Sequence, residues 1–248
     1  MSSSAARTLR ILETVGAAER PLGPTEIGQK LGLPAGTVFR GLDALDRAGY
    51  VARFRASSKF VLGKSVAALR QSLLARFPIR DVTAPYLRQL AFASGETCSL
   101  TVRLGWCGLR IAAAPGTNEV TNAPPLGAVR PLGEGLAGRA ILAFLRDAPP
   151  EKPLARVLAE IRQRGFATEE TAFARGRAAI AFPLRRDGQA IAAIAVEGPV
   201  IDLKNASAHD DLPRWREIVE PVERLAQARP ALFAGPFDHL DPDDVRLG

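Results

Sequence analysis

The segment that most constrains the fold of this chain is residues 24–50, PTEIGQKLGLPAGTVFRGLDALDRAGY, which predicts two short helices set against each other. In the first helix, Ile27 and Leu31 lie four residues apart and fall on one face. Thr25 stands where the N-cap is expected, and Gly32 is expected to stop the helix.

The second helix of this pair is predicted to follow a tight turn at Leu33-Pro34 and to end at Gly49. Its buried stripe has i, i+4, i+7 spacing and consists of Val38, Leu42 and Leu45. The outward face is small and polar in its N-terminal half and consists of Ala35, Gly36, Thr37, Arg40, Asp43 and Arg47. Such a face fits a DNA major groove. An ordinary helical hairpin with a solvated face would have the same pattern.

The net charge of the 248-residue chain is concentrated in the segment that contains the helix pair. Residues 1–76 hold twelve Lys or Arg and five acidic residues, a balance of +7 that equals the formal charge of the whole chain. The remaining residues balance to zero. This segregation is what we expect if only the N-terminal segment approaches a polyanion such as DNA.

The segments on either side of the helix pair complete a recognisable unit. Residues 7–18 predict a supporting helix whose apolar stripe comes from Leu9 and Leu12, with Ile11 and Val15 as further candidates. Residues 50–55 and 59–62 alternate around Ala56-Ser57-Ser58 and predict a small β-hairpin. The order of three helices and a hairpin predicts a winged helix-turn-helix. Its wing carries three basic residues suited to phosphates or a minor groove: Arg53, Arg55 and Lys59.

Residues 64–76 predict an amphipathic linker helix that opens after Gly63. Its apolar stripe is Val66, Leu69, Leu73 and Phe77. An apolar stripe of this kind has to be buried against another protein surface. A second copy of the chain would place two recognition helices about one DNA turn, ~34 Å, apart. Packing on the second domain of the same chain is the alternative, because periodicity does not identify the partner.

From Asp81 onward the pattern predicts one mixed α/β domain. The expected helices are 85–93, 135–145, 153–164 and 215–228, and the expected strands are 97–104, 107–114, 119–123, 178–185 and 190–197. Asp187-Gly188 is a strong hairpin signal between the last two strands. These two strands are almost continuously apolar, so we expect them near the centre of a sheet covered on both faces. The Pro- and Asp-rich tail from Pro230 is expected to be loosely held.

Several classes of protein are disfavoured by composition. Only two cysteines are present, Cys98 and Cys107, and neither they nor the two histidines have metal-site spacing. We therefore predict no metal and no cofactor. No apolar run reaches the ~18 residues of a membrane span, and the N-terminus lacks the apolar region of a signal peptide. A soluble, cytoplasmic globular protein without membrane partners is expected.

The motifs in their order resemble the IclR-type bacterial transcriptional regulators. The resemblance covers nearly all of residues 5–228 and rests on LPAGTVFRGLDALDRAGYV, FVLG, GETCSLTV, GLAGRAILAFL and RGFATEETAFARGRAAIAFPLRRDGQAIAAIAVEGP. It implies an α+β chain in which an N-terminal winged helix-turn-helix domain is joined by a linker helix to a C-terminal GAF-like mixed α/β effector domain. The corresponding boundaries are 1–62 for the DNA-binding domain, 63–77 for the linker helix, 78–228 for the effector domain and 229–248 for the tail.

The resemblance also assigns DNA-binding roles, because Thr37, Phe39 and Arg40 match the recognition-helix face of the family. Arg40 would clamp a guanine edge or hold a phosphate, and Thr37 would meet a base or the backbone. Phe39 has a second possible place in the core, since it adjoins Val38 on the helical wheel. The predicted DNA-binding set is Thr25, Ala35, Gly36, Thr37, Phe39, Arg40, Arg53, Arg55 and Lys59.

The family's effector pocket lies between the sheet and a glycine-rich helix start, here residues 133–138, whose N–H groups would be available to an anion. The predicted effector-binding set is Cys98, Asn122, Arg130, Gly135, Leu136, Ala137, Glu169, Ala179, Ala195 and Glu197.

The effector site departs from the family pattern. Members that bind small acids often have a cysteine at the position of Ala179 and hydroxyl residues at the positions of Ala195 and Glu197. The carboxylate of Glu197 would repel an acid unless the acid were protonated or paired with a base such as Arg130. We therefore expect a ligand that offers donors to Glu197 or Glu169, such as an amine, a polyol or a hydroxylated aromatic. A Glu197 that points to solvent from the strand end is the alternative.

The sequence thus predicts a ligand-responsive DNA-binding transcriptional regulator, a repressor more often than an activator in this family, acting as a dimer or tetramer on a palindromic operator. A DNA-binding or architectural protein without a ligand is the main alternative. An enzyme is the remote one, because no nucleophile-base pair, GxSxG motif or phosphate-binding loop is present in the sequence.

Overall fold

The computed structural model describes residues 3–55, 57–117, 125–146, 153–169, 177–199 and 211–236. The chain divides into two compact units, Met1–Ala75 and Arg76–Gly248. Each unit has its own core, and each is described by itself.

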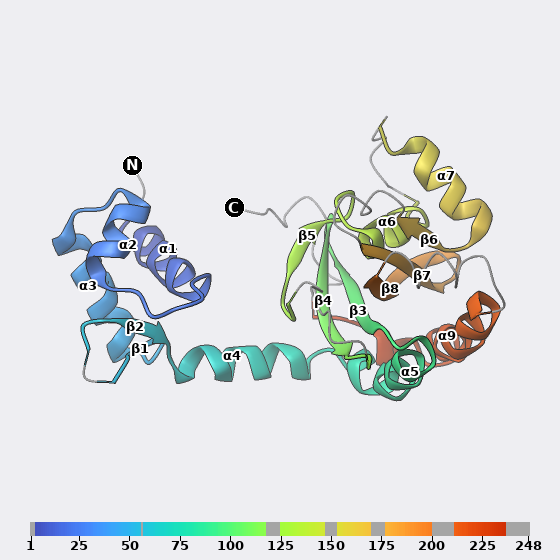
Figure 1. Cartoon of the computed structure of the whole chain (residues 1–248), viewed down its shortest axis with the longest axis horizontal. Helices are drawn as coiled ribbons and strands as arrows, with labels where there is room; N and C mark the ends of the chain where they lie inside the picture. The colour runs from blue at the N-terminus through green and yellow to red at the C-terminus, as the bar shows by residue number, and fades with distance from the viewer. Residues whose placement is uncertain are drawn as a thin grey trace. The chain divides into compact units, whose positions relative to one another are not determined.

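The first unit contains three helices, a two-stranded sheet and a fourth helix (Figure 1). In chain order these are α1 (Ser4–Gly16), α2 (Pro24–Leu31), α3 (Ala35–Arg47), β1 (Val51–Arg53), β2 (Phe60–Leu62) and α4 (Lys64–Ala75). The strands pair antiparallel with Ala52 opposite Val61. The core gathers one apolar face from every element before α4: Ile11, Val15, Leu22, Ile27, Val38, Leu42, Leu45, Val51 and Phe60. This is the predicted winged helix-turn-helix.

Two local predictions in this unit are wrong. The buried face of α1 consists of Ile11 and Val15, whereas Leu9 is 57% exposed. The cap of α2 is Gly23 rather than Thr25, because the helix already begins at Pro24. A proline is suited to the first helical position, where no N–H donor is needed, so the helix starts two residues earlier than predicted. The stop at Gly32 is confirmed, since this residue caps α2 in the left-handed conformation with φ 63°.

Helix α4 has no buried residue. Leu69 is 55% exposed, while Val66 and Leu73 are partly covered. The fourth residue of the predicted stripe, Phe77, lies beyond the helix and is 3% exposed. The apolar stripe of α4 is therefore largely open within the described first unit.

The second unit is a six-stranded antiparallel sheet with helices on both faces, of order β5-β4-β3-β8-β7-β6. The strands are β3 (Thr97–Leu104), β4 (Cys107–Ala114), β5 (Val129–Pro131), β6 (Ala167–Glu169), β7 (Arg177–Arg186) and β8 (Gln189–Pro199). The helices are α5 (Ile79–Ser94), α6 (Leu136–Leu142), α7 (Ala155–Arg164) and α9 (Asp211–Ala228), followed by the 3-10 turn η2 (Pro230–Phe233).

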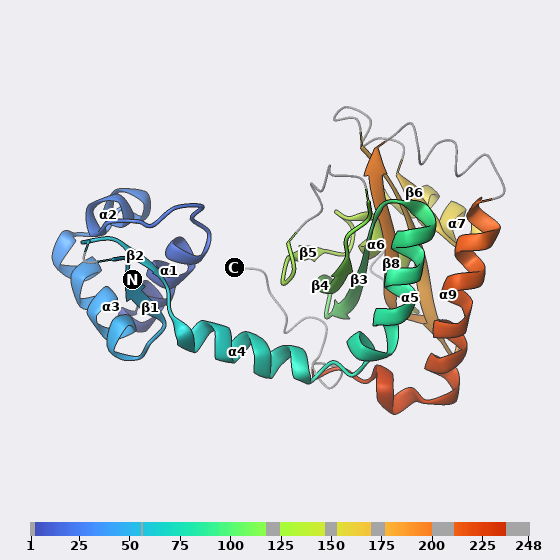
Figure 2. The same ribbon diagram turned by 60° about the horizontal axis from the view of Figure 1, so that its bottom comes forward.

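The two faces of the sheet carry different helices. Helices α5 and α9 run side by side against one face, where α5 contacts β3 and β4 and α9 contacts β7 (Figure 2). Helix α6 packs on the opposite face, chiefly over β7 and β8, and α7 contacts α6 and β6. We call this opposite face the α6 face. The predicted central position of β8 between covering helices is confirmed.

The hairpin of β7 and β8 has its turn where the sequence predicted it. Asp187 and Gly188 both have positive φ, 53° and 77°. Two consecutive residues of this kind make the turn whose twist matches a right-handed strand pair.

Other predictions for this unit need correction. Helix α5 begins at Ile79 and contains Pro85, so the proline lies inside the helix and not at its start. Strands β5 and β6 were not predicted, because three residues show no periodicity. The predicted strand 119–123 lies outside the described residues. The start of the predicted loose tail is packed, because residues 230–233 form η2 and Phe233 is 6% exposed.

Candidate nucleic-acid interface and effector site

The outward face of α3 is exposed along its length. Its buried side consists of Val38, Gly41, Leu42 and Leu45, so the helix turns the other residues away from the core. Ala35, Gly36 and Arg40 are exposed, and Thr37 is partly covered. A Cβ placed on Gly36 would meet nothing within 4 Å, which leaves the first turn open to a close approach.

Phe39 resolves a question that the helical wheel left open. The residue is 58% exposed and does not belong to the core. Its neighbour Val38 is fully buried. A step of about 100° per residue is enough to move a side chain from the core to the surface of the helix.

The C-terminal half of the outward face of α3 is partly neutralised. Arg47 donates to the carboxylate of Asp43 one turn earlier. The hydrogen bond with Asp43 raises the pKa of the exposed Arg47 guanidinium. Arg40, by contrast, has no such partner in the described part of the chain. Its guanidinium is therefore available to a ligand that binds the N-terminal half of the outward face of α3.

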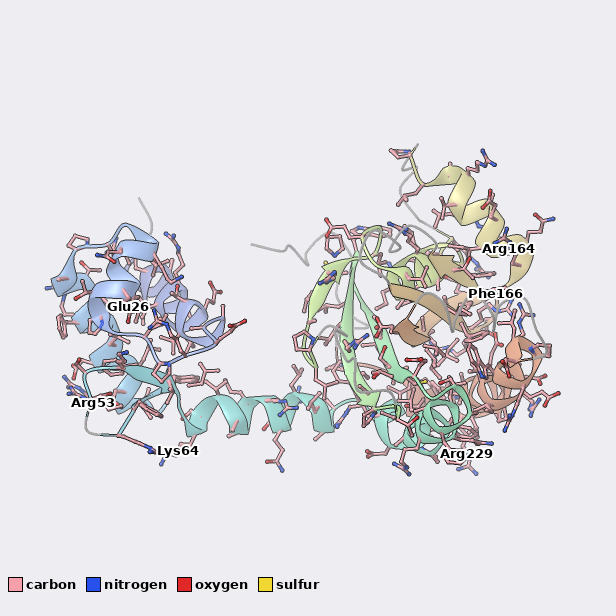
Figure 3. All side chains as sticks on the ribbon, viewed as in Figure 1. Glu26, Arg53, Lys64, Arg164, Phe166 and Arg229 are labelled. Carbon is pink, nitrogen blue, oxygen red and sulfur yellow. The ribbon has the colours of Figure 1, made fainter. Side chains whose placement is uncertain are left out.

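Two arginines of the wing, Arg53 and Arg55, lie over aromatic rings. Arg53 is labelled in Figure 3. The Arg53 guanidinium lies 5.6 Å from the centre of the Phe60 ring, and its Nε is 3.9 Å from Asp46 Oδ2. Arg55 has a positive φ of 38°, and its guanidinium lies 5.6 Å from the Phe54 ring centre. Both arginines and Lys59 are exposed. The predicted basic wing is therefore present as a surface.

Thr25 is exposed on the first turn of α2, next to a charged cap. Glu26 accepts a hydrogen bond from the Gly23 N–H at 2.8 Å and pairs with Arg20 at 2.6 Å. The Arg20 hydrogen bond, with the backbone bond from Gly23, lowers the pKa of the Glu26 carboxyl below its ordinary value.

The second candidate site lies on the α6 face of the sheet. Strand β3 alternates, so Thr97, Ser99 and Thr101 lie on one face while Cys98 and its apolar neighbours lie on the other. Thr97 stands opposite Glu197, and Ser99 stands opposite Ala195. Ala195 packs in the core cluster beneath α6, which identifies this row as the α6 face.

An ion pair crosses this row. Arg110 of β4 stands opposite Thr101, and its guanidinium binds the carboxylate of Glu197 on β8, on the far side of β3. The Arg110 side chain is 7% exposed and that of Glu197 is 16% exposed. Glu197 therefore points across the sheet rather than to solvent, and its charge is balanced by Arg110, which the sequence analysis had not singled out.

Ser99 contributes an unsatisfied hydroxyl to the same row. It is fully buried, and its Oγ has no hydrogen-bond partner among the described residues. A buried hydroxyl without a partner costs about 1–3 kcal/mol, so such groups are exceptional in native folds. Thr97 and Thr101, on either side, are also buried.

The residues of β7 that pair with Glu197 and Ala195 of β8 have small side chains. Ala179 of β7 stands opposite Glu197 on one side and Glu169 of β6 on the other. Ala181 stands opposite Ala195. The register thus brings the predicted residues Glu169, Ala179 and Glu197 into one line across three strands. The side chain of Glu169 lies outside what the structure describes.

The glycine-rich segment before α6 is packed tightly. A Cβ on Gly138 would lie 2.8 Å from the Leu132 Cα, and Arg139 Nε donates to the Gly133 carbonyl at 2.8 Å. Gly135 caps α6, Leu136 is 7% exposed in the core, and Ala137 packs against the same cluster. Because α6 has only seven residues, its N-terminus carries little of the dipole that the predicted anion site needed.

Two predicted effector residues, Cys98 and Arg130, do not join this group. Cys98 lies on the α5 face, where its sulfur is 3.9 Å from Ser94 Oγ, so it is on the opposite face of the sheet from Ser99 and Glu197. Arg130 is exposed on β5, and Glu197 pairs with Arg110 instead. Asn122 lies outside the described residues.

Both cysteine thiols are poorly suited to act as nucleophiles, because their pKa values are raised. Burial raises the pKa of Cys98 to about 12, and the nearby charges of Glu197 and Glu96 act in the same direction. Burial also raises the pKa of Cys107. Within the described residues there is no group of His, Cys, Asp and Glu that could hold a metal ion.

The sequence contains a signal for the residues of the α6 face that the prediction did not include, namely the hydroxyl residues of β3 and Arg110. In Thr97-Cys98-Ser99-Leu100-Thr101 the hydroxyl residues recur at every second position, which marks one face of a strand. Arg110 is a lone charge inside an apolar strand.

Comparison with protein families accounts for both units. The model described as the IclR helix-turn-helix domain matches residues 4–53, and the model described as the bacterial transcriptional regulator IclR C-terminal domain matches residues 71–154. The chain belongs to the IclR family. It is therefore a DNA-binding transcriptional regulator, with the predicted helix-turn-helix and α/β units in the predicted order.

Relatives cover most of this IclR-family chain. It is 29% identical over 231 residues to the probable transcriptional regulator SauR of Cupriavidus necator, across 80% of this chain and 87% of that protein. It is 26% identical to the transcriptional repressor IclR of Escherichia coli, across 79% and 80%. An IclR homologue from Microbacterium hydrocarbonoxydans, solved with 4-hydroxybenzoate, has the same fold with a TM-score of 0.71, 21% identity and coverage of 91% and 98%.

Among the helices that the structure describes, none is long and apolar enough to cross a membrane.

Proposed function

We propose that this protein binds a palindromic operator as a dimer or tetramer, that a small molecule held on the α6 face changes this binding, and that repression is its regulatory outcome. The observation that carries the proposal is the open outward face of α3, which presents Arg40 within a unit that holds +6 of the chain's net charge of +7. A basic surface of this kind gains affinity by releasing counterions from DNA.

Assembly is supported by α4. The helix has no buried residue in its own unit, and its stripe includes a Leu69 that is 55% exposed. An apolar stripe of this kind is stable in water only when covered. A second copy covers it symmetrically and spaces two α3 helices by about one DNA turn, ~34 Å. Packing against the second unit of the same chain remains the alternative arrangement.

The chemistry of the α6 face limits the ligand. Glu197 already has a balancing charge in Arg110, and both side chains are largely buried. An anion that bound Arg110 would take the ion-pair partner of Glu197 away, and a cation that bound Glu197 would break the same ion pair from the other side. Either exchange costs about 3–5 kcal/mol, the penalty of breaking a buried pair.

An uncharged, hydroxylated ligand avoids that cost. It can pair with the unsatisfied Ser99 hydroxyl and with the flanking threonines while the ion pair stays intact. We therefore narrow the expected effector to a polyol or a neutral hydroxylated aromatic. The homologue solved with 4-hydroxybenzoate supports an aromatic skeleton, although its ligand carries an acid.

The test of DNA binding is a salt series with DNA from beside the coding region of this protein. Wild type is compared with Arg40→Ala and with Arg156→Ala, a control that removes an exposed arginine from α7. We expect Arg40→Ala to weaken specific binding and to reduce the slope of log K against log salt by about 1 if the arginine holds a phosphate. A guanine contact would instead relax specificity at one base pair. Equal binding by wild type and Arg40→Ala contradicts the assignment of this face.

The test of the ligand uses probes with one skeleton and different charge. 4-Hydroxybenzyl alcohol, 4-hydroxybenzoate and 4-hydroxybenzylamine are compared by thermal shift, with glycerol and glycerate as the aliphatic pair. We expect stabilisation by a neutral member and loss of that effect in Ser99→Ala. An acid that binds tightly, and no more tightly to Glu197→Gln, contradicts the argument from charge.

A regulator without a ligand is the second candidate, favoured if no probe shifts the melting temperature or the DNA affinity. We propose no catalytic role, because both cysteines have raised pKa values and the Glu197 carboxylate of the α6 face is engaged in an ion pair. As a DNA-binding protein, it is expected to act in the cytoplasm.

A further inference from the structure

Phe39 differs from the other residues on the outward face of α3. It is 58% exposed on α3, where the other outward side chains are small or charged. Its position gives it no share in the core, because Val38, Gly41, Leu42 and Leu45 fill the buried side of the helix. A large aromatic ring left in water on a helix that faces DNA is placed where it can contact the DNA.

The position of Phe39 on α3 determines which part of the DNA its ring can contact. On a helix of 3.6 residues per turn it lies about 100° from Arg40 and on the same half of the surface. Gly36, one turn before Arg40, leaves that side of the first turn unobstructed. A helix that enters the major groove with Arg40 toward a base edge therefore brings the Phe39 ring against the groove at a neighbouring base pair.

The major groove offers one apolar group, the 5-methyl of thymine. Apart from the small C5–H of cytosine, the groups that a protein reads on its base edges are hydrogen-bond donors or acceptors, which a phenyl ring cannot satisfy. We infer that Phe39 is a specificity-determining residue that reads the 5-methyl group of a thymine beside the base pair contacted by Arg40. This inference rests on the proposed DNA-binding function and names the base that one side chain selects.

The wing provides a contrast within the same unit. Phe54 is 40% exposed, but the Arg55 guanidinium lies 5.6 Å from the centre of its ring. Its ring already has a cationic partner, and it lies on the hairpin rather than on α3. Phe54→Ala is therefore a matched control for removal of an exposed ring from the same unit.

The experiment begins with the full-length protein and a library of random DNA duplexes, from which bound sequences are selected. In the best selected site, each thymine is then replaced by deoxyuridine, which removes only the 5-methyl group. Affinities are measured for wild type, Phe39→Ala and Phe54→Ala, and circular dichroism confirms that the variants are folded.

We expect one thymine in each half-site whose replacement weakens wild-type binding about fourfold, the effect of burying a single methyl group. Phe39→Ala should bind the thymine and uracil sites equally, whereas Phe54→Ala should keep the fourfold preference. The inference is overturned if no thymine shows a methyl effect or if Phe39→Ala retains it. If the selection enriches no sequence at all, the proposed DNA-binding function itself fails.

Discussion

Replacement of Glu197 by glutamine removes one charge from an ion pair whose side chains are 7% and 16% exposed. The Arg110 guanidinium then remains in the sheet interior without its balancing carboxylate. Breaking a buried pair costs about 3–5 kcal/mol, and we expect about 3 because glutamine still offers an oxygen to the guanidinium. Arg110→Met leaves Glu197 without its balancing charge and should cost a similar amount.

The double variant, Arg110→Met with Glu197→Leu, should recover most of the lost stability. Two apolar side chains of similar volume have no charge to desolvate, so a buried ion pair is often replaced in this way at little cost. Measured against the single variants Arg110→Met and Glu197→Leu, the two substitutions should be coupled by at least about 2 kcal/mol. For a unit of this size, the single variants should lower the melting temperature by about 6–12 °C.

Urea unfolding followed by tryptophan fluorescence is the appropriate assay. Trp106 and Trp215 are the only tryptophans of the chain, and both belong to the second unit, so the signal reports the domain that holds the pair. Glu160→Gln is the control, because Glu160 pairs with Arg156 on the surface of α7 and its loss should cost less than about 0.5 kcal/mol. A Glu197→Gln variant as stable as this control, or a double variant as unstable as the sum of the singles, would refute the reasoning.

Three further predictions concern other parts of the chain. Gly138→Ala should destabilise the second unit by about 1–3 kcal/mol in urea, because its new methyl meets backbone that cannot yield, whereas Gly135→Ala, with open space around it, should not. Cys98 and Cys107 should resist a thiol reagent at pH 8 until the protein is unfolded, because burial keeps both thiols protonated. The stabilising effect of Glu26 should be present above its ordinary pKa and lost as the pH falls through its lowered folded value; the melting temperatures of wild type and Glu26→Gln should converge there.

The first unit was largely predictable from the sequence. Its elements are short and local, and each is bounded by a residue with a strong backbone preference, as at Gly32 and Pro34. The stripe of α3 agrees with the prediction, because a helix whose face packs on two neighbours must repeat its apolar residues at helical spacing. The charge segregation also belongs to the sequence alone, since it needs no coordinates.

The errors in the first unit arose where several apolar side chains of one helix could each occupy the core. Leu9, Ile11, Leu12 and Val15 offer two possible faces for α1, and only packing against α3 selects the face of Ile11 and Val15. In the same way, Phe39 adjoins Val38 on the wheel, and the core has room for only one of them.

The effector site depends most on tertiary structure. Cys98 and Ser99 are adjacent in sequence, yet successive side chains of a strand point to opposite faces, so one contacts α5 and the other faces α6. Glu197 and Arg110 are 87 residues apart. Neither local periodicity nor composition relates two residues at that separation, because their meeting is created by the order β4-β3-β8 in the sheet.

The sequence by itself determined that the protein has a winged helix-turn-helix unit, that its positive charge lies there, and that an α/β unit follows. These properties depend on periodicity, turn residues and net charge, which are local or additive. Only the tertiary structure decided which residues oppose one another on the α6 face and whether Glu197 keeps an unbalanced charge. The reason is that strand register and sheet order, which bring distant side chains into contact, are set by packing of the whole domain.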